Sequence, residues 1–111
     1  MFFVRLKYQI FVFLHYRDLK NNRIYKIEGG AFQTVTTTYS ILLSNNKLKE
    51  IQPYAFSDIN VASLDLGGNT GIGNIPSYAF NNVRCETFNL HESGVTSIGA
   101  NALNNFNVNT L

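Results

Sequence analysis

The stretch LSNNKLKEIQPYAF at residues 43–56 decides the fold, because the chain repeats it three more times with few changes. The related segments are LKNNRIYKIEGGAF at 19–32, LGGNTGIGNIPSYAF at 66–80 and LHESGVTSIGANAL at 90–103. Equivalent positions are spaced by 24, 23 and 24 residues, counted at Asn22, Asn46, Asn69 and Ser93. A regular period of this length predicts a solenoid, in which each repeat forms one coil and neighbouring coils stack.

The repeats also divide the chain. Residues 14–111 are predicted to hold about four repeats, with a fifth beginning at the end, where NNFNVNTL places Leu111 in the position of Leu64 and Phe88. Residues 1–13 are predicted to form an edge strand or a partial repeat, since apolar and other residues alternate from Val4 to Leu14. This segment is too short to span a bilayer, and its charges argue against a secretory signal.

Within each repeat, alternate residues of a short strand should point to opposite faces. This alternation predicts parallel strands near residues 17–19, 40–43, 63–66 and 87–90, with little helix. Their inward residues are Leu19, Ile41, Leu43, Leu64, Leu66, Phe88 and Leu90. The asparagines Asn22, Asn46 and Asn69 follow the strands, where an amide can satisfy backbone groups left unpaired by the turn.

Two further sets of residues recur with the same period. One set is predicted to fill the middle of the coil, as Ile24 with Ile27, Leu48 with Ile51, Ile72 with Ile75, and Val95 with Ile98. The other set pairs a small residue with a large one and is predicted to form an apolar column on the convex side. Its small members are Ala31, Ala55, Ala79 and Ala102, and its large members are Phe32, Phe56, Phe80 and Leu103.

The segments VASLDLGGN (61–69) and CETFNLHES (85–93) resemble the leucine-rich-repeat pattern L-x-x-L-x-L-x-x-N-x-L. The resemblance covers residues 14–111 and departs from the pattern at Arg17, Thr38 and Ser93. It implies an α/β-type leucine-rich-repeat solenoid with a curved parallel sheet, a mostly irregular convex side and little helix.

More specifically, the run from GGAF at residue 29 to LHESGVTSIGANALNNF is similar to the ectodomain of glycoprotein-hormone-receptor-type proteins. That resemblance implies an extracellular receptor that binds its ligand on the concave face. The segment GVTSIGANAL also resembles BspA-like surface repeats, and an intracellular leucine-rich-repeat scaffold is the third alternative. The location is therefore expected to be extracellular or at the cell surface, with the cytoplasm as the alternative.

The alternation predicts which side chains a partner would meet on the concave face. These binding residues are Tyr16, Asp18, Lys20, Ser40, Leu42, Ser44, Ser63, Asp65, Thr87, Asn89 and His91. Ser40, Ser63, Thr87 and Thr110 form a column of small polar residues, which leaves a shallow face suited to a protein or peptide ligand. A solvated sheet face whose ligand docks elsewhere is the alternative.

Other function classes find little support in the composition. A charged fraction of 14% and a formal net charge of +2 do not indicate a nucleic-acid partner. His15, His91 and the single Cys85 have no metal-ligand spacing, and Cys85 sits at an inward position where a buried thiol is expected. No catalytic motif, metal or small-molecule cofactor is predicted, and any membrane attachment is expected through a part of the protein outside this chain.

Overall fold

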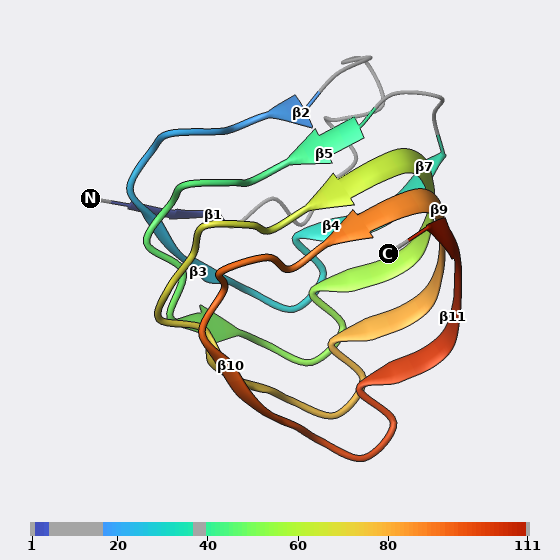
Figure 1. Ribbon diagram of the computed structural model, residues 1–111. Helices are drawn as coiled ribbons and strands as arrows, with labels where there is room; N and C mark the ends of the chain where they lie inside the picture. Colours follow the sequence, from blue (N-terminus) through green and yellow to red (C-terminus); the bar gives the residue numbers. More distant parts are fainter. Residues whose placement is uncertain (1, 5–16, 37–39, 111) are drawn as a thin grey trace.

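The computed structural model describes residues 2–4, 17–36 and 40–110. Figure 1 shows the chain winding in one direction into coils that stack side by side. The described residues form strands and turns but no helix. The strands are β1 (Phe2–Val4), β2 (Arg17–Asp18), β3 (Ile24–Ile27), β4 (Phe32–Thr36), β5 (Ser40–Leu42), β6 (Glu50–Ile51), β7 (Phe56–Asp65), β8 (Gly73–Ile75), β9 (Phe80–Asn89), β10 (Val95–Ile98) and β11 (Leu103–Thr110).

The strands pair in parallel from one coil to the next. The largest sheet has the order β11-β9-β7-β5-β2, and the first half of β7 also pairs with β4. On another side of the coil, β1, β3 and β6 form a sheet, and β8 pairs with β10. The register advances by one repeat at each step, as in Ile41 opposite Leu64 and Leu64 opposite Phe88. The curved parallel sheet and the solenoid are therefore confirmed.

The predicted strands lie where expected, but two of them are much longer than the alternation indicated. β7 begins at Phe56 and β9 at Phe80, so both include the region expected to be mostly irregular. That expectation is wrong because alternation continues there, with Ile59 and Val61 buried and Asn60 exposed between them. Figure 1 shows β7, β9 and β11 curving round this side of the coil.

Residues with left-handed backbone recur at three places in the coil. One set is Asn21, Asn45, Gly68 and Glu92, the second is Gly30, Tyr54, Tyr78 and Asn101, and the third is Asp58, Asn82 and Asn105. Asparagine, aspartate and glycine adopt this conformation more readily than other residues. At Gly94, whose φ is 72°, the requirement is also steric, because a β-carbon there would collide with the backbone carbonyl of Thr70.

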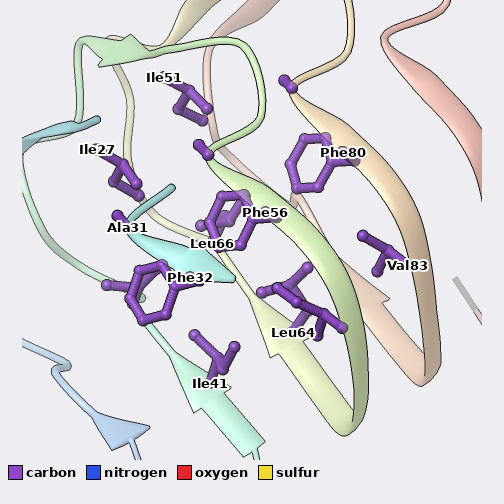
Figure 2. Close-up of a cluster of buried hydrophobic side chains, with 14 of the residues drawn as sticks. Ile27, Ala31, Phe32, Ile41, Ile51, Phe56, Leu64, Leu66, Phe80 and Val83 are labelled. Carbon is purple, nitrogen blue, oxygen red and sulfur yellow. The ribbon is translucent and has the colours of Figure 1, made fainter. Parts of the chain in front are cut away.

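The core is built from columns of identical residues. Phe32, Phe56 and Phe80 are fully buried and stacked face to face, with ring centroids 5.3 and 4.9 Å apart (Figure 2). The small residue before each one is also buried, which confirms the predicted pairing of sizes. Leu103 takes the next place in register, opposite Phe80, but is 42% exposed because it lies in the last described coil.

The asparagines after the strands form hydrogen bonds with backbone groups in the turns of their own and neighbouring coils. Asn69 is fully buried; its Oδ1 accepts the N–H groups of Asn46 and Leu48, and its Nδ2 donates to the carbonyls of Leu43 and Leu66. These contacts confirm that Asn69 is structural.

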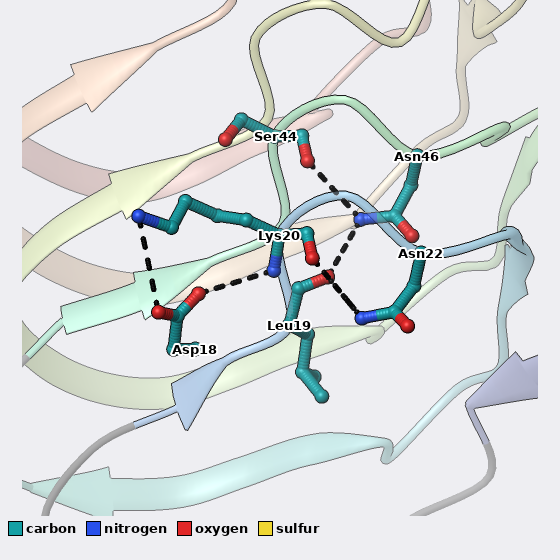
Figure 3. A network of polar contacts seen from close by, with 6 residues as sticks. All are labelled: Asp18, Leu19, Lys20, Asn22, Ser44 and Asn46. Atoms are coloured by element: carbon teal, nitrogen blue, oxygen red, sulfur yellow. Dashed lines mark hydrogen bonds and ion pairs between the residues drawn. The ribbon is translucent and has the colours of Figure 1, made fainter.

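Asn46 bonds in the same way, because its Oδ1 accepts from the Ile24 N–H and its Nδ2 donates to the Leu43 carbonyl. Figure 3 shows the other two bonds of this Nδ2, to the carbonyls of Leu19 and Ser44. Asn22 is exposed, and its Nδ2 donates to the carbonyls of Leu19 and Lys20 in its own turn. Ser93 is buried at the equivalent position of the last repeat.

The predicted N-terminal strand falls partly outside the described residues. β1 pairs in parallel with β3, whereas residues 5–16, including Tyr16 and His15, are not described. No helix in the described part of the chain is long and apolar enough to cross a bilayer.

Candidate ligand-binding face

The outward side chains of β2, β5 and the final parts of β7 and β9 form one surface, which we call the ladder face. Its described members are the predicted binding residues Asp18, Lys20, Ser40, Leu42, Ser44, Ser63, Asp65, Thr87, Asn89 and His91, all exposed or half-buried. Between them lie buried residues such as Ile41, Leu64 and Phe88. The period-two alternation thus placed every described member of the predicted set on the outer side of the sheet.

Parallel pairing aligns these side chains into columns across the coils. One column runs through Ser40, Ser63 and Thr87, and the backbone register continues to Thr110. The Thr87 hydroxyl donates to the Ser63 Oγ at 2.8 Å. A hydroxyl can both donate and accept, so this column offers a partner both kinds of hydrogen bond.

The neighbouring column contains Asp18, Leu42, Asp65 and Asn89. Asn89 Nδ2 donates to Asp65 Oδ1 at 3.0 Å, which connects two coils at the surface. Leu42 is half-buried and places an apolar side chain between the two carboxylates. The column therefore combines acidic, amide and apolar side chains on four neighbouring strands, each about 4.8 Å from the next.

Three members of this column also shape the turn that follows their strand. Asp65 Oδ1 accepts the Gly67 N–H at 2.9 Å, and Asn89 Oδ1 accepts the His91 N–H at 2.8 Å. Asp18 accepts the Lys20 N–H in the same way at 3.2 Å. Aspartate and asparagine commonly bond to the backbone two residues ahead. Sequence reasoning missed this role, although an acidic or amide residue stands at this position in three of the four aligned strands.

The charges on the ladder face are only partly neutralised. Lys20 Nζ lies 3.8 Å from Asp18 Oδ2, but both side chains are exposed and such a pair contributes little. His91 lies 3.9 Å from Glu92 and attracts it only when protonated. Asp65 uses Oδ1 for both of its hydrogen bonds, so Oδ2 has no partner among the described residues. The face therefore presents one carboxylate oxygen available to a ligand.

A hollow that the sequence did not reveal adjoins the ladder face at the last described coil. It has a volume of about 630 Å³ and is lined by Phe88, Asn89, Leu90, His91, Leu103, Phe106 and Val108. Phe88 and Phe106 meet edge to face with centroids 4.9 Å apart at its wall. The hollow thus places apolar surface next to two polar members of the ladder face.

Cys85 faces inward, as predicted, and is 3% exposed. Burial raises the pKa of its thiol, and the neighbouring Glu86 carboxylate raises that pKa further. Both effects keep the thiol protonated and poorly nucleophilic. The described residues include no group of three or more histidine, cysteine, aspartate and glutamate side chains that could hold a metal ion.

Comparison with known proteins identifies the type of repeat. The family model described as a BspA type leucine rich repeat region matches residues 13–111 in six copies. No curated protein and no solved structure matches the chain. The expected similarity to glycoprotein-hormone-receptor ectodomains is not supported by these comparisons. The chain belongs to the BspA-type leucine-rich-repeat family.

Proposed function

We propose that this chain is a protein-binding module and that the ladder face receives the partner. BspA-type repeats of this kind are protein-interaction or adhesion modules. The observation that carries the assignment to this face is the column of aligned polar groups around Asp65. The Oδ1 atom of Asp65 accepts hydrogen bonds from the Gly67 N–H and from Asn89 Nδ2, while its Oδ2 is left for a ligand.

The geometry of the ladder face suits a protein surface. Residues held on strands are positioned more rigidly than residues on long loops, so their contacts lose little entropy on binding. Leu42 supplies an apolar contact beside the carboxylate, and Ser63 and Thr87 supply hydroxyls. Changes at these outward positions should leave the core intact, because the packed residues of the same strands point the other way.

We further propose that binding takes place outside the cell or at its surface, with any membrane attachment made by a part of the protein beyond this chain. The support is the family, whose repeats are typical of surface or secreted proteins. This proposal makes the cell-surface fraction the source in which a partner should be found.

The test uses the double variant Asp65→Asn/Leu42→Ser. Asparagine retains the oxygen that accepts the Gly67 N–H but removes the charge, so the turn is preserved. The immobilised chain is used to capture partners separately from a cell-surface extract and from cytosol, and the captured protein is then purified and titrated. We expect about tenfold or greater weakening, or roughly 1.4 kcal/mol, with an unchanged unfolding midpoint.

The matched control is Asp58→Asn/Ile98→Ser, which also replaces one aspartate by asparagine and one aliphatic residue by serine, but away from the ladder face. Both control side chains are exposed, and Asp58 has a left-handed backbone that asparagine tolerates. Equal weakening by the two double variants would contradict the site, and a partner found only in cytosol would contradict the location. Gln52 is unsuitable as a control because its Oε1 accepts the Gly29 N–H.

A further inference from the structure

A second surface, on another side of the coil from the ladder face, gathers four cations from the first two described coils. We call this surface the basic patch, and its members are Arg23, Lys26, Lys47 and Lys49. The Lys47 N–H donates to the Ile24 carbonyl and the Lys49 N–H donates to the Tyr25 carbonyl, both at 2.9 Å. These bonds place cations that are more than 20 residues apart in sequence on adjacent coils, in and just before β3 and β6.

The alternation of the two coils turns these cations outward. Ile24 and Leu48 are fully buried, whereas Arg23, Lys47 and Lys49 on either side of them are exposed. Because these backbone hydrogen bonds join the two coils directly, the charged side chains start from closely spaced backbone positions. The exposed charged groups of Arg23, Lys47 and Lys49 therefore share one small area of surface.

Carboxylates in the same two coils do not form ion pairs with these three cations. The ion pairs among the described residues join Lys20 to Asp18 and His91 to Glu92, and neither involves the basic patch. Glu50 lies opposite Lys26, where its Oε2 accepts a hydrogen bond from Gln52 at 3.2 Å. The positive charge of Arg23, Lys47 and Lys49 is thus left for a ligand.

The charge is also unevenly distributed along the solenoid. Residues 17–52 contain six lysines and arginines against three carboxylates, whereas residues 53–110 contain one against four. The low net charge of the chain, +2, therefore conceals a positive region and a negative one. A positive region of this kind attracts anions and raises their local concentration.

Beyond the basic patch, the same side of the next coils is polar and uncharged. β8 and β10 pair there, and Ser97 Oγ donates to Asn74 Oδ1 at 2.7 Å between two exposed side chains. Thr70 and Thr96 are exposed in the same coils. Amides and hydroxyls both donate and accept hydrogen bonds, as sugar hydroxyls do.

We propose that this side of the solenoid binds an acidic polysaccharide. Its carboxylate or sulfate groups contact Arg23, Lys47 and Lys49, and its hydroxyls contact the amide and hydroxyl side chains of the following coils. A membrane surface fits less well, because the exposed large hydrophobic residues Tyr54, Ile98 and Leu103 are not among the cations. The inference is independent of the ladder face and of its protein partner.

Binding is measured with the full chain and with defined polymers. Heparin and polygalacturonate supply sulfate and carboxylate groups, neutral dextran is the uncharged control, and duplex DNA and anionic phospholipid vesicles represent the other polyanions. We expect binding to both acidic polysaccharides and none to dextran. Because each cation that contacts the polymer releases bound counterions, log K should fall with log salt with a slope of about −2 to −3.

The decisive comparison uses two double variants with the same net charge. Lys47→Gln/Lys49→Gln removes two members of the basic patch, and Lys20→Gln/Arg84→Gln removes two exposed cations elsewhere. We expect about tenfold weaker heparin binding at moderate salt for the first and less than about twofold for the second. Unchanged thermal unfolding would show that both variants remain folded.

Three results would overturn the proposal. Equal weakening by the two double variants would show that only the overall charge matters. Tighter binding of DNA or vesicles than of either polysaccharide would show that the partner class is wrong. Absence of binding to heparin and polygalacturonate at low salt would show that the basic patch is a solvated surface.

Discussion

At the scale of single residues, buried amides hold the turns together because the coil leaves backbone groups inside the protein. Asn46 and Asn69 each accept from one or two N–H groups and donate to carbonyls of their own coil and of the coil before it. A side chain with both donor and acceptor atoms is required at this place. The residue before each amide, Asn45 or Gly68, provides the left-handed bend that directs the amide inward.

We predict that Asn46→Ala destabilises the fold by about 1–3 kcal/mol, since its loss leaves buried backbone groups without partners. Urea unfolding monitored by circular dichroism measures the change. Asn45→Gly is the control, because Asn45 is exposed and glycine adopts its φ of 56° without strain. Asn45→Ala is a poorer control, because alanine in the left-handed conformation itself costs about 1–2 kcal/mol. Equal destabilisation by Asn46→Ala and Asn45→Gly would mean that the buried amide has no special role.

At the scale of elements, the strands are joined by aromatic packing as well as by hydrogen bonds. Phe32, Phe56 and Phe80 stand at or near the start of β4, β7 and β9 and stack with interplanar angles of 3° and 6°. The stack then changes geometry, since Phe80 meets Phe88 and Phe106 edge to face. Because the same ring recurs at the same register, each strand start is fixed against the next by a large buried contact.

Phe56 lies in the middle of this stack, so we predict that Phe56→Ala costs about 3–5 kcal/mol and Phe56→Leu distinctly less. Leu103→Ala tests the equivalent position in the last coil, where the side chain is 42% exposed. Its cost should stay below about 1.5 kcal/mol, because little buried volume is lost. Measured free energies of unfolding of the three variants test these predicted changes in stability. A larger loss for Leu103→Ala than for Phe56→Ala would contradict the assignment of the stack as the main contact between strands.

At the scale of the whole molecule, stability depends on contacts between successive coils. Equivalent inward residues become exposed at the last described coil. Their exposed fractions are 0% for Ile27, 3% for Ile51, 1% for Ile75 and 58% for Ile98. In a solenoid each coil contacts only its neighbours, so a coil with one described neighbour is held by fewer contacts. β9 lies between β7 and β11, whereas β11 pairs with β9 alone among the described strands.

This arrangement predicts a gradient of hydrogen exchange. When residues 1–111 are measured by themselves, amides of β7 and β9, averaged over each strand, should exchange at least about tenfold more slowly than those of β11. In that chain β11 pairs on one side only among the described strands, so its local opening needs less free energy. Mass spectrometry of proteolytic fragments, or nuclear magnetic resonance, gives the rates. Uniform rates in the three strands would show instead that the coils open only as one cooperative unit.

The sequence alone determined the repeat, the parallel sheet and the direction of most side chains. These features are predictable because each depends on a local pattern. Alternation separates Leu64 from Ser63 and Asp65, and a recurring amide identifies Asn46 and Asn69 as structural. The same alternation placed the described members of the ladder face on one surface, although their use in binding stays a prediction.

Tertiary structure alone decided which of these side chains meet across coils. Three such contacts join residues from different repeats: the bond between Asn89 and Asp65, the backbone bond from Lys47 to Ile24, and the apolar hollow at Phe106. Their geometry depends on the register and curvature of the stack. The early start of β7 and β9 was missed because the alternation changes phase inside each strand, at Ala62–Ser63 and Glu86–Thr87, where two successive residues are not buried. The exposure of Leu103 was missed for a related reason, since a repeat pattern records which residues face inward but only the neighbouring coil buries them.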